Sequence, residues 1–462
     1  MTDTLTRDLA DATAGETVQV IAAGKISALE ATDAAIARIE ARDGAINAVV
    51  VRDFDRARET AKAADAAIAR GERKPLLGVP MTVKEANWVA GLPTTWGMEM
   101  WKDWKAPVDG VGIQRLKAAG AVILGTTYVP PMLSDLQSDN PVYGRTNNPW
   151  DVTRTPGGSS GGSAAALAAG MVPLEFGSDI GGSIRIPAGF CGVYGHKPSY
   201  GVVPLRGHTP PGVEGVDVPV AVIGPMARTA ADLELAMSVL AGPDADEAVG
   251  YSLALPPPRH ERLADYRVLV LDHHPLAGID DEIKAALNDL GDRLERLGAR
   301  VDRQSDLLPD LVESQRVYGM ILNTAMTMGQ PGAKPPNAHE WMGLLGEQLA
   351  IRRQWATLFQ GFDVVLAPTL GTLAFRHDAN PDMFARTIDL NGQQTPYFAQ
   401  IAWSGVATLP HLPATAAPIG RSRAGLPIGA QIIGPYLEDR TTIAFAGLLE
   451  REFGGFVKPA GY

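Results

Sequence analysis

The sequence contains only one cysteine, Cys191, in 462 residues. A single cysteine excludes an internal disulfide and a cluster of thiolate metal ligands. Lysine and arginine form no long run, and the formal net charge of −11 disfavours a nucleic-acid-binding surface. No apolar run reaches membrane-spanning length, and residues 1–10 contain no apolar signal core. We therefore expect a cytoplasmic protein that contacts neither nucleic acid nor membrane.

Helical and strand-like patterns alternate in the first half of the chain. Apolar runs at residues 46–51, 76–84 and 120–125 are typical of strands, while residues 54–70 and 113–119 favour helices. The hydrophobic share of 45% is enough for a large core. This alternation predicts an α/β fold with a mainly parallel sheet.

After residue 242 the regular alternation of helical and strand-like patterns stops, and strand-like runs return later in the chain. Asp280 is placed to cap a helix, and strand-like runs resume at residues 364–368 and 428–433. We expect a single domain over residues 1–462. Its parts are an N-terminal helical part (1–70), a core that carries the motifs (71–235), a peripheral and more variable helical section (245–360) and a C-terminal return to the sheet (361–462).

Two glycine–serine clusters stand out, residues 157–163 (GGSSGGS) and residues 181–183 (GGS). Glycine lets backbone N–H groups crowd around a reacting atom, and a serine hydroxyl beside such amides suits acyl transfer. The first cluster alone is also typical of a flexible linker or of a phosphate-binding loop. A phosphate loop needs a lysine after its last glycine, whereas Gly162 is followed by Ser163 and alanines.

A nucleophilic serine needs a base within hydrogen-bond reach. The chain has eight histidines, but none lies in a Gly-x-Ser-x-Gly nucleophile elbow, which disfavours a Ser–His–Asp triad without removing it. Lys84 ends an apolar run, and burial would bring the pKa of its amine far below ~10.4, so that it could act as a base. A solvated lysine at a strand end is the alternative.

These segments resemble the amidase signature family. The resemblance covers nearly the whole chain and rests on Lys84 and on residues 157–163, 177–188, 224–229 and 425–434. It implies the amidase signature fold, an α/β architecture whose central mixed, mostly parallel twisted sheet is covered by helices on both faces. It also implies that no metal or organic cofactor is needed.

The resemblance further implies a Ser–cis-Ser–Lys triad. In it Ser183 is the nucleophile, Ser159 the bridging serine joined to Gly158 by a cis peptide bond, and Lys84 the neutral base. The backbone N–H groups expected in the oxyanion hole are those of Ile180, Gly181, Gly182 and Ser183. The side chains expected to support the network are Ser160, Ser178, Asp179 and Arg185, with a purely structural Asp179–Arg185 ion pair as the alternative.

Several residues near the motifs have less specific roles. Glu85 stands where the family often has aspartate, Cys191 is expected in the core, and His196 is expected to be structural rather than catalytic. Residues 198–225, rich in proline and glycine, predict a long ordered loop near the site. The side chains predicted to bind substrate, with ordinary core packing as the alternative, are Met132, Leu133, Trp96 and Trp403.

The resemblance predicts an amidase that hydrolyses a carbon–nitrogen bond other than a peptide bond in a small molecule, as a monomer or homodimer. Esters, anilides and carbamates, the last as in urethanases, stay open as substrates. One alternative is the glutamine-hydrolysing subunit of a tRNA-dependent amidotransferase, whose tyrosine-rich segment has a single counterpart here, Tyr318. Another alternative is a non-enzymatic binding protein on the same fold.

Overall fold

The structure is a computed structural model that describes residues 9, 11–213, 217–328 and 332–462. Most of the segment considered for a signal sequence, residues 1–10, therefore lies outside the described residues, as do three residues of the predicted loop 198–225. Within the part that is described, no helix is both long and apolar enough to cross a membrane.

One large sheet runs through the molecule. Its eleven strands lie in the order β1 (Val49–Arg52), β3 (Val122–Thr127), β2 (Pro80–Lys84), β6 (Leu174–Asp179), β8 (Val222–Ala227), β7 (Tyr194–Lys197), β14 (Ala414–Arg421), β15 (Pro427–Ile433), β11 (Val364–Pro368), β9 (Arg267–Val270) and β10 (Arg300–Asp302). Two small two-stranded sheets lie apart from it, β4 (Asp139–Asn140) with β5 (Gly144–Arg145) and β12 (Thr387–Leu390) with β13 (Gln393–Pro396).

The large sheet is mixed, as predicted. Parallel pairs lie on its two flanks, where β2 adjoins β3 and β6, and where β9 adjoins β10 and β11. Its centre, from β6 through β8, β7, β14 and β15 to β11, is antiparallel. Strands β14 and β15 follow each other across a short turn, and a turn of this kind joins only antiparallel strands. The parallel share is therefore smaller than the alternation of helix and strand predicts.

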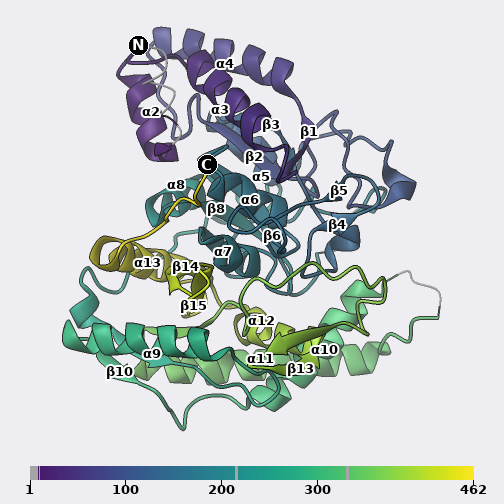
Figure 1. Ribbon diagram of the computed structural model, residues 1–462, viewed down its shortest axis with the longest axis vertical. Helices are drawn as coiled ribbons and strands as arrows, with labels where there is room; N and C mark the ends of the chain where they lie inside the picture. Colours follow the sequence, from purple (N-terminus) through teal and green to yellow (C-terminus); the bar gives the residue numbers. More distant parts are fainter. Residues whose placement is uncertain (1–8, 10, 214–216, 329–331) are drawn as a thin grey trace.

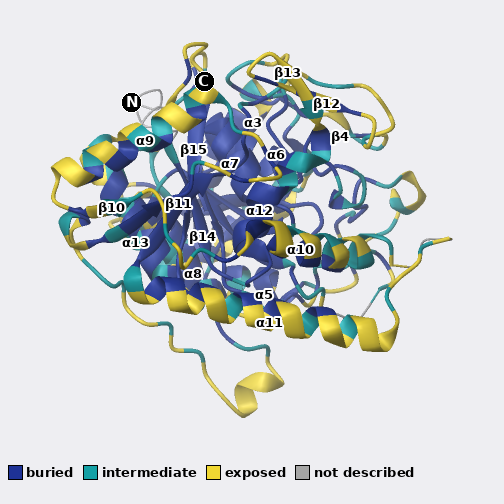
Figure 2. Cartoon of the chain, turned by 90° about the horizontal axis from the view of Figure 1, so that it is seen from below, coloured by how far each residue is buried: buried dark blue, intermediate teal, exposed yellow. Residues whose placement is uncertain are grey.

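Helices surround the sheet (Figure 1). They are α2 (Ala14–Ala22), α3 (Ala28–Arg42), α4 (Phe54–Ala69), α5 (Val111–Ala118), α6 (Gly161–Ala168), α7 (Arg185–Cys191), α8 (Ala230–Leu240), α9 (Asp281–Arg296), α10 (Leu311–Met326), α11 (Ala338–Gly361), α12 (Ile401–Thr408) and α13 (Asp439–Phe453). The helices α2, α3 and α4 lie at one end of the molecule, and α9, α10 and α11 lie at the other (Figure 1). Figure 2 shows the buried strands β15, β11 and β14 between α9 and α11, with exposed residues on the outer faces of these two helices.

Both faces of the sheet are packed. In β3, Ile123 belongs to a core cluster that includes α5, α8, α9 and α13, while Val122 and Leu124 belong to a second cluster with α3, α4 and α6. Successive residues of a strand point to opposite faces, so these two clusters cover the two sides. The predicted covering of both faces by helices is confirmed at this strand.

Local signals in the sequence predict where several helices begin. Ser27 forms the N-terminal capping box of α3 with Glu30, and the Asp280 side chain accepts the Glu282 N–H at the start of α9. The strand-like run predicted at residues 46–51 forms β1 at the sheet edge. One boundary differs from the prediction. The last residues of the predicted loop 198–225 already belong to β8.

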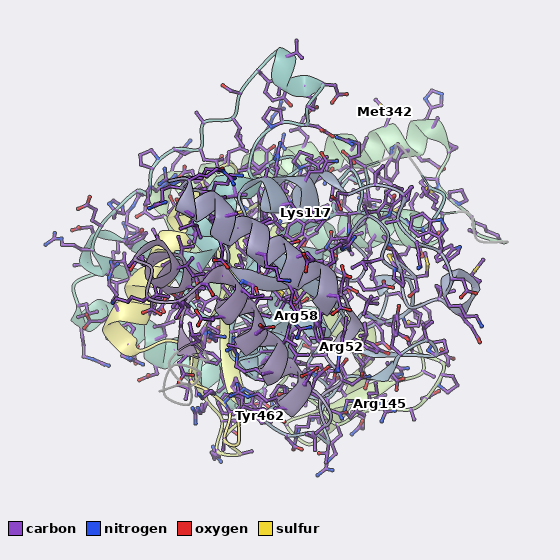
Figure 3. All side chains as sticks on the ribbon, turned by 90° about the horizontal axis from the view of Figure 1, so that it is seen from above. Arg52, Arg58, Lys117, Arg145, Met342 and Tyr462 are labelled. Carbon is purple, nitrogen blue, oxygen red and sulfur yellow. The ribbon has the colours of Figure 1, made fainter. Side chains whose placement is uncertain are left out.

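Ion pairs lie mainly on the outside of the molecule. Figure 3 shows Arg58 and Arg145 at the surface, where Arg58 pairs with Asp33 and Arg145 with Asp139, each at 2.7 Å. Exposed pairs of this kind contribute about 0–1 kcal/mol each. The fold therefore depends on its two apolar layers rather than on these surface charges.

Candidate active site

Lys84 is the last residue of β2 and is fully buried. Its Nζ donates to three hydroxyls, at 2.6 Å to Ser159, 3.0 Å to Ser160 and 2.9 Å to Ser178. Burial lowers the pKa of Lys84 to about 7, although the charges of Asp179 and Glu175 oppose this shift. The amine is therefore no solvated surface lysine, and it can be neutral near pH 7 while touching a serine hydroxyl.

The first glycine–serine cluster brings Ser159 to this amine. The Gly158–Ser159 peptide bond is cis. A Cβ on Gly158 would lie 2.3 Å from the carbonyl oxygen of Asp135 and 2.7 Å from that of Gln137. Only glycine fits so close to two carbonyls, so this residue fixes the path of the chain into Ser159.

The second cluster lies directly against the first. The N–H of Ser160 donates to the carbonyl of Ser183 at 3.1 Å, and the Ser183 side chain is nearly buried. Just before Ser183, Gly182 has a φ of 93°, and a Cβ there would lie 2.2 Å from Ser404 Oγ. The two clusters, 24 residues apart between Ser159 and Ser183, thus form one site at the start of α7.

The backbone amides before Ser183 are not all alike. The Gly182 N–H donates to Asp179 Oδ1 at 2.9 Å. This bond within the loop occupies an N–H that the sequence predicts in the oxyanion hole. Among the described residues, the N–H groups of Ile180, Gly181 and Ser183 donate no hydrogen bond. The Tyr318 hydroxyl on α10 donates to the Ile180 carbonyl at 2.8 Å and so orients that peptide. Three of the four predicted amides therefore stay available for a developing negative charge.

Asp179 and Arg185 form a buried ion pair beside this loop. Arg185 Nη2 lies 2.8 Å from Asp179 Oδ1, and neither side chain is exposed. Burial alone would raise the pKa of Asp179, but the Arg185 guanidinium lowers it to about 2. Asp179 also accepts the Ile184 N–H at 3.1 Å, while Arg185 donates to Gln431 at 2.6 Å. The pair thus ties the loop of the nucleophile to the sheet and keeps a fixed negative charge there.

Three of the four predicted substrate residues lie together. Trp96 and Leu133 belong to one small cluster with Ala86, and Met132 packs against it. The Met132 N–H donates to the Trp96 carbonyl at 2.8 Å. Trp403 lies elsewhere, fully buried in the core cluster of α10, α11 and α12, and its indole N–H donates to the Gly278 carbonyl at 3.2 Å. The structure therefore places Trp403 in the core and does not bring it to the other three.

Glu85 and His208 are neighbours of the site whose roles the sequence did not reveal. Glu85 is fully buried, and its carboxylate accepts the N–H of Trp96 at 3.0 Å and that of Thr95. The His208 ring lies 5.4 Å from the Trp96 ring, centroid to centroid. Burial, followed by the charge of Lys84, lowers the pKa of His208 to about 3. Nothing in the sequence distinguishes His208 from the other histidines except its place in the predicted loop near the site.

His196 and Cys191 both lie in the interior. His196 is fully buried, with its Nε2 3.1 Å from Asp439 Oδ1 and its Nδ1 2.9 Å from Thr415 Oγ1. This arrangement fits the structural role expected of it. Cys191 is fully buried as a free thiol, and burial raises its pKa. The expected core position of Cys191 is confirmed.

Comparison with known proteins identifies the family. A family model described as Amidase matches residues 30–345 and 335–443. The chain belongs to the amidase signature family. Its relatives include a Glutamyl-tRNA(Gln) amidotransferase subunit of Anaeromyxobacter dehalogenans (strain 2CP-C), which is 34% identical, with 95% of this chain and 96% of the relative covered. The Fatty-acid amide hydrolase 2-A of Danio rerio is 32% identical, with 94% of this chain and 87% of the relative covered.

Solved structures of the amidase signature family have the same fold. A bacterial aryl acylamidase is 28% identical with a TM-score of 0.82, and 98% of this chain and 99% of that chain are covered. The 6-aminohexanoate cyclic dimer hydrolase complexed with substrate is 26% identical with a TM-score of 0.81, with the same coverage. As a member of this family the protein is a hydrolase of carbon–nitrogen bonds.

Proposed function

We propose that the protein hydrolyses a small-molecule amide through an acyl-enzyme on Ser183, with Ser159 as proton relay and Lys84 as base. The observation that supports this most strongly is the 2.6 Å contact between the buried Lys84 amine and the Ser159 hydroxyl. A buried amine with a pKa of about 7 can accept a proton at neutral pH, which an ordinary lysine cannot.

The proposed reaction uses these groups in turn. Ser159 passes a proton from Ser183 to neutral Lys84 while Ser183 attacks the amide carbonyl. The free N–H groups of Ile180, Gly181 and Ser183 receive the negative charge that develops on oxygen. The proton then returns along the relay to the leaving amine, and water repeats the path to release the acid. Apart from the substrate and water, each step uses groups of this chain.

The substrate class follows from the cluster around Trp96, Met132 and Leu133. Aromatic and methionine side chains suit aryl or aliphatic groups, so we propose aryl amides and anilides first, with esters and carbamates as further substrates. One structural neighbour, an aryl acylamidase, supports this choice, and another, a 6-aminohexanoate cyclic dimer hydrolase, supports aliphatic amides as further substrates. The free thiol of Cys191 fits a reducing cytoplasm, and we retain a monomer or homodimer as the assembly.

Covalent labelling tests the nucleophile. A fluorophosphonate should label Ser183 stoichiometrically, and Ser183→Ala should lose both labelling and amide hydrolysis. Ser238→Ala is a matched control, because Ser238 is exposed on α8, and it should label like the wild type. Labelling of another residue, or activity that persists in Ser183→Ala, would refute the mechanism.

A second candidate function is glutamine hydrolysis within a tRNA-dependent amidotransferase. The 34% identity to a Glutamyl-tRNA(Gln) amidotransferase subunit over 95% of the chain favours it. We rank it second because the tyrosine-rich segment is represented here by Tyr318 alone, whose hydroxyl is occupied by the Ile180 carbonyl. A panel of glutamine, aryl amides, short aliphatic amides, esters and carbamates, ranked by kcat/KM, separates the two. Glutamine as the best substrate, with transamidation in the presence of the partner subunits, would reverse the ranking.

A further inference from the structure

Two aromatic side chains next to the catalytic lysine carry buried nitrogens that have no partner. Trp96 Nε1 and His208 Nδ1 are both buried, and neither has a hydrogen-bond partner among the described residues. Their rings lie 5.4 Å apart at an interplanar angle of 37°. The two nitrogens thus belong to one pair of neighbouring rings.

Three other tryptophans of the chain do pair their indole N–H. The indole N–H of Trp88 donates to the Thr209 carbonyl at 3.0 Å, that of Trp150 to the Cys191 carbonyl at 2.9 Å and that of Trp403 to the Gly278 carbonyl at 3.2 Å. A buried donor without a partner is destabilising, because it has lost its water and gained nothing. At Trp96, beside the candidate active site, a group that arrives with the substrate can fill this vacancy.

The backbone holds Trp96 firmly in this place. Its N–H is bound at 3.0 Å by the carboxylate of Glu85, the residue that directly follows Lys84. Trp96, Met132 and Leu133 all have positive φ, at 51°, 52° and 58°, a conformation that non-glycine residues adopt rarely. Strained residues of this kind persist only where the surroundings enforce them, and they gather at functional sites. Trp96 is therefore held in place by the segment that also carries Lys84.

His208 reaches Trp96 from a different segment, the loop between β7 and β8. Burial and then the charge of Lys84 lower its pKa to about 3, so the ring is neutral and carries one N–H. A hydrogen bond to the Ala86 backbone opposes this shift, so the ring donates its one N–H there and the unpartnered Nδ1 is an acceptor. Trp96 Nε1 is therefore the free donor of the pair.

We propose that Trp96 and His208 form a subsite for a planar group of the amide substrate that carries a neutral hydrogen-bond acceptor, such as an aryl ketone. This inference rests on the proposed amidase function and narrows it to aryl amides whose ring bears a carbonyl-type oxygen. The ring of the substrate packs against the two side chains, and its acceptor takes the free N–H of Trp96.

The test compares two nearly isosteric substituents, acetyl and isopropenyl, on each side of the amide bond. One arm uses 4-acetylbenzamide against 4-isopropenylbenzamide, and the other uses N-(4-acetylphenyl)acetamide against N-(4-isopropenylphenyl)acetamide. The readout is the ratio of kcat/KM for acetyl over isopropenyl. In one arm, Trp96→Phe should lower this ratio roughly threefold to tenfold, because a neutral hydrogen bond is lost. The responding arm shows whether the acyl or the amine side occupies the subsite.

A control variant and the results that would contradict the proposal complete the test. Trp150→Phe removes an indole N–H that is bound elsewhere, so it should leave both ratios within twofold of the wild type. Each ratio compares two substrates on one preparation, so a partly unfolded variant does not distort it. Unchanged ratios in both arms, with Ser183 still labelled by a fluorophosphonate, would overturn the subsite alone. Loss of Ser183 labelling in the wild type would instead overturn the proposed function.

Discussion

Lys84 and Lys197 are two fully buried lysines at the ends of strands, and their surroundings differ. Burial lowers the pKa of each to about 7. Lys84 donates to three serine hydroxyls, whereas Lys197 donates to the Pro198 carbonyl at 3.0 Å and is further affected by the charge of Arg185. The pKa is lowered to a similar value in both lysines, but the groups that accept their hydrogen bonds differ.

The comparison shows that a lowered pKa alone does not make a base. A hydroxyl can give a proton to a neutral amine, and a second hydroxyl can replace that proton, so the contacts of Lys84 fit the end of the proposed relay. A backbone carbonyl has no proton to give. We therefore assign the chemistry to Lys84, and we expect Lys197 to act on stability.

Removal of the amine at position 84 should have the largest effect. Lys84→Ala should lower kcat/KM by about 10³-fold or more, as the loss of a general base does when it acts together with the nucleophile. Lys197→Met should keep kcat/KM within a few-fold of the wild type. Single-turnover acylation measures both, with circular dichroism to establish folding. A loss of only a few-fold in folded Lys84→Ala would remove Lys84 from the mechanism.

The pH dependence of activity should sharpen the contrast. Only neutral Lys84 accepts a proton, and its neutral fraction falls about tenfold per pH unit below the pKa, which is about 7. The kcat/KM of the wild type should therefore rise with pH to about 7 and then level off. Lys197→Met should keep this acid limb in place. If the acid limb of the kcat/KM profile shifts to another pH in Lys197→Met, the profile reports the titration of Lys197 instead of Lys84.

The smallest effect concerns stability. The folded pKa of Lys197, about 7, lies below its value of ~10.4 in the unfolded chain, so between these pH values the unfolded state binds more protons and stability rises with pH. Below pH 7 the charged amine is buried, and this destabilises the wild type but not Lys197→Met. The variant should therefore gain most at pH 6, and its advantage should shrink by up to about 1.4 kcal/mol per pH unit toward pH 10. Urea unfolding at pH 6, 8 and 10 measures it, and a pH-independent difference would contradict it.

Local signals explain how far the sequence could predict the fold. Caps and apolar spacing located α3 and α9 closely, because those signals act within one or two turns. The antiparallel centre of the sheet was not predicted, because strand direction depends on which distant strands become neighbours. The sequence predicts a loop up to residue 225 for a similar reason, since β8 is a strand only through its pairing with β6 and β7.

The site was predictable to the extent that its chemistry lies in short motifs. Lys84, Ser159 and Ser183 stood out by residue type and family resemblance, and the structure brings their segments together. The bond of the Gly182 N–H to Asp179 depends on the bend of the loop, which composition does not reveal. His208 comes from a segment with no motif, so its place beside Trp96 appears only in three dimensions.

The burial of Cys191 has a practical consequence for labelling chemistry. Its Sγ lies 3.6 Å from the Pro156 carbonyl in the interior, and burial raises its pKa, so maleimides meet no accessible thiolate in the folded protein. Since the chain has no other cysteine, a thiol introduced at an exposed position such as Val249, which is 90% exposed, would be the single reactive one. A fluorophore or spin label can thus be attached at one chosen point without first removing a native cysteine.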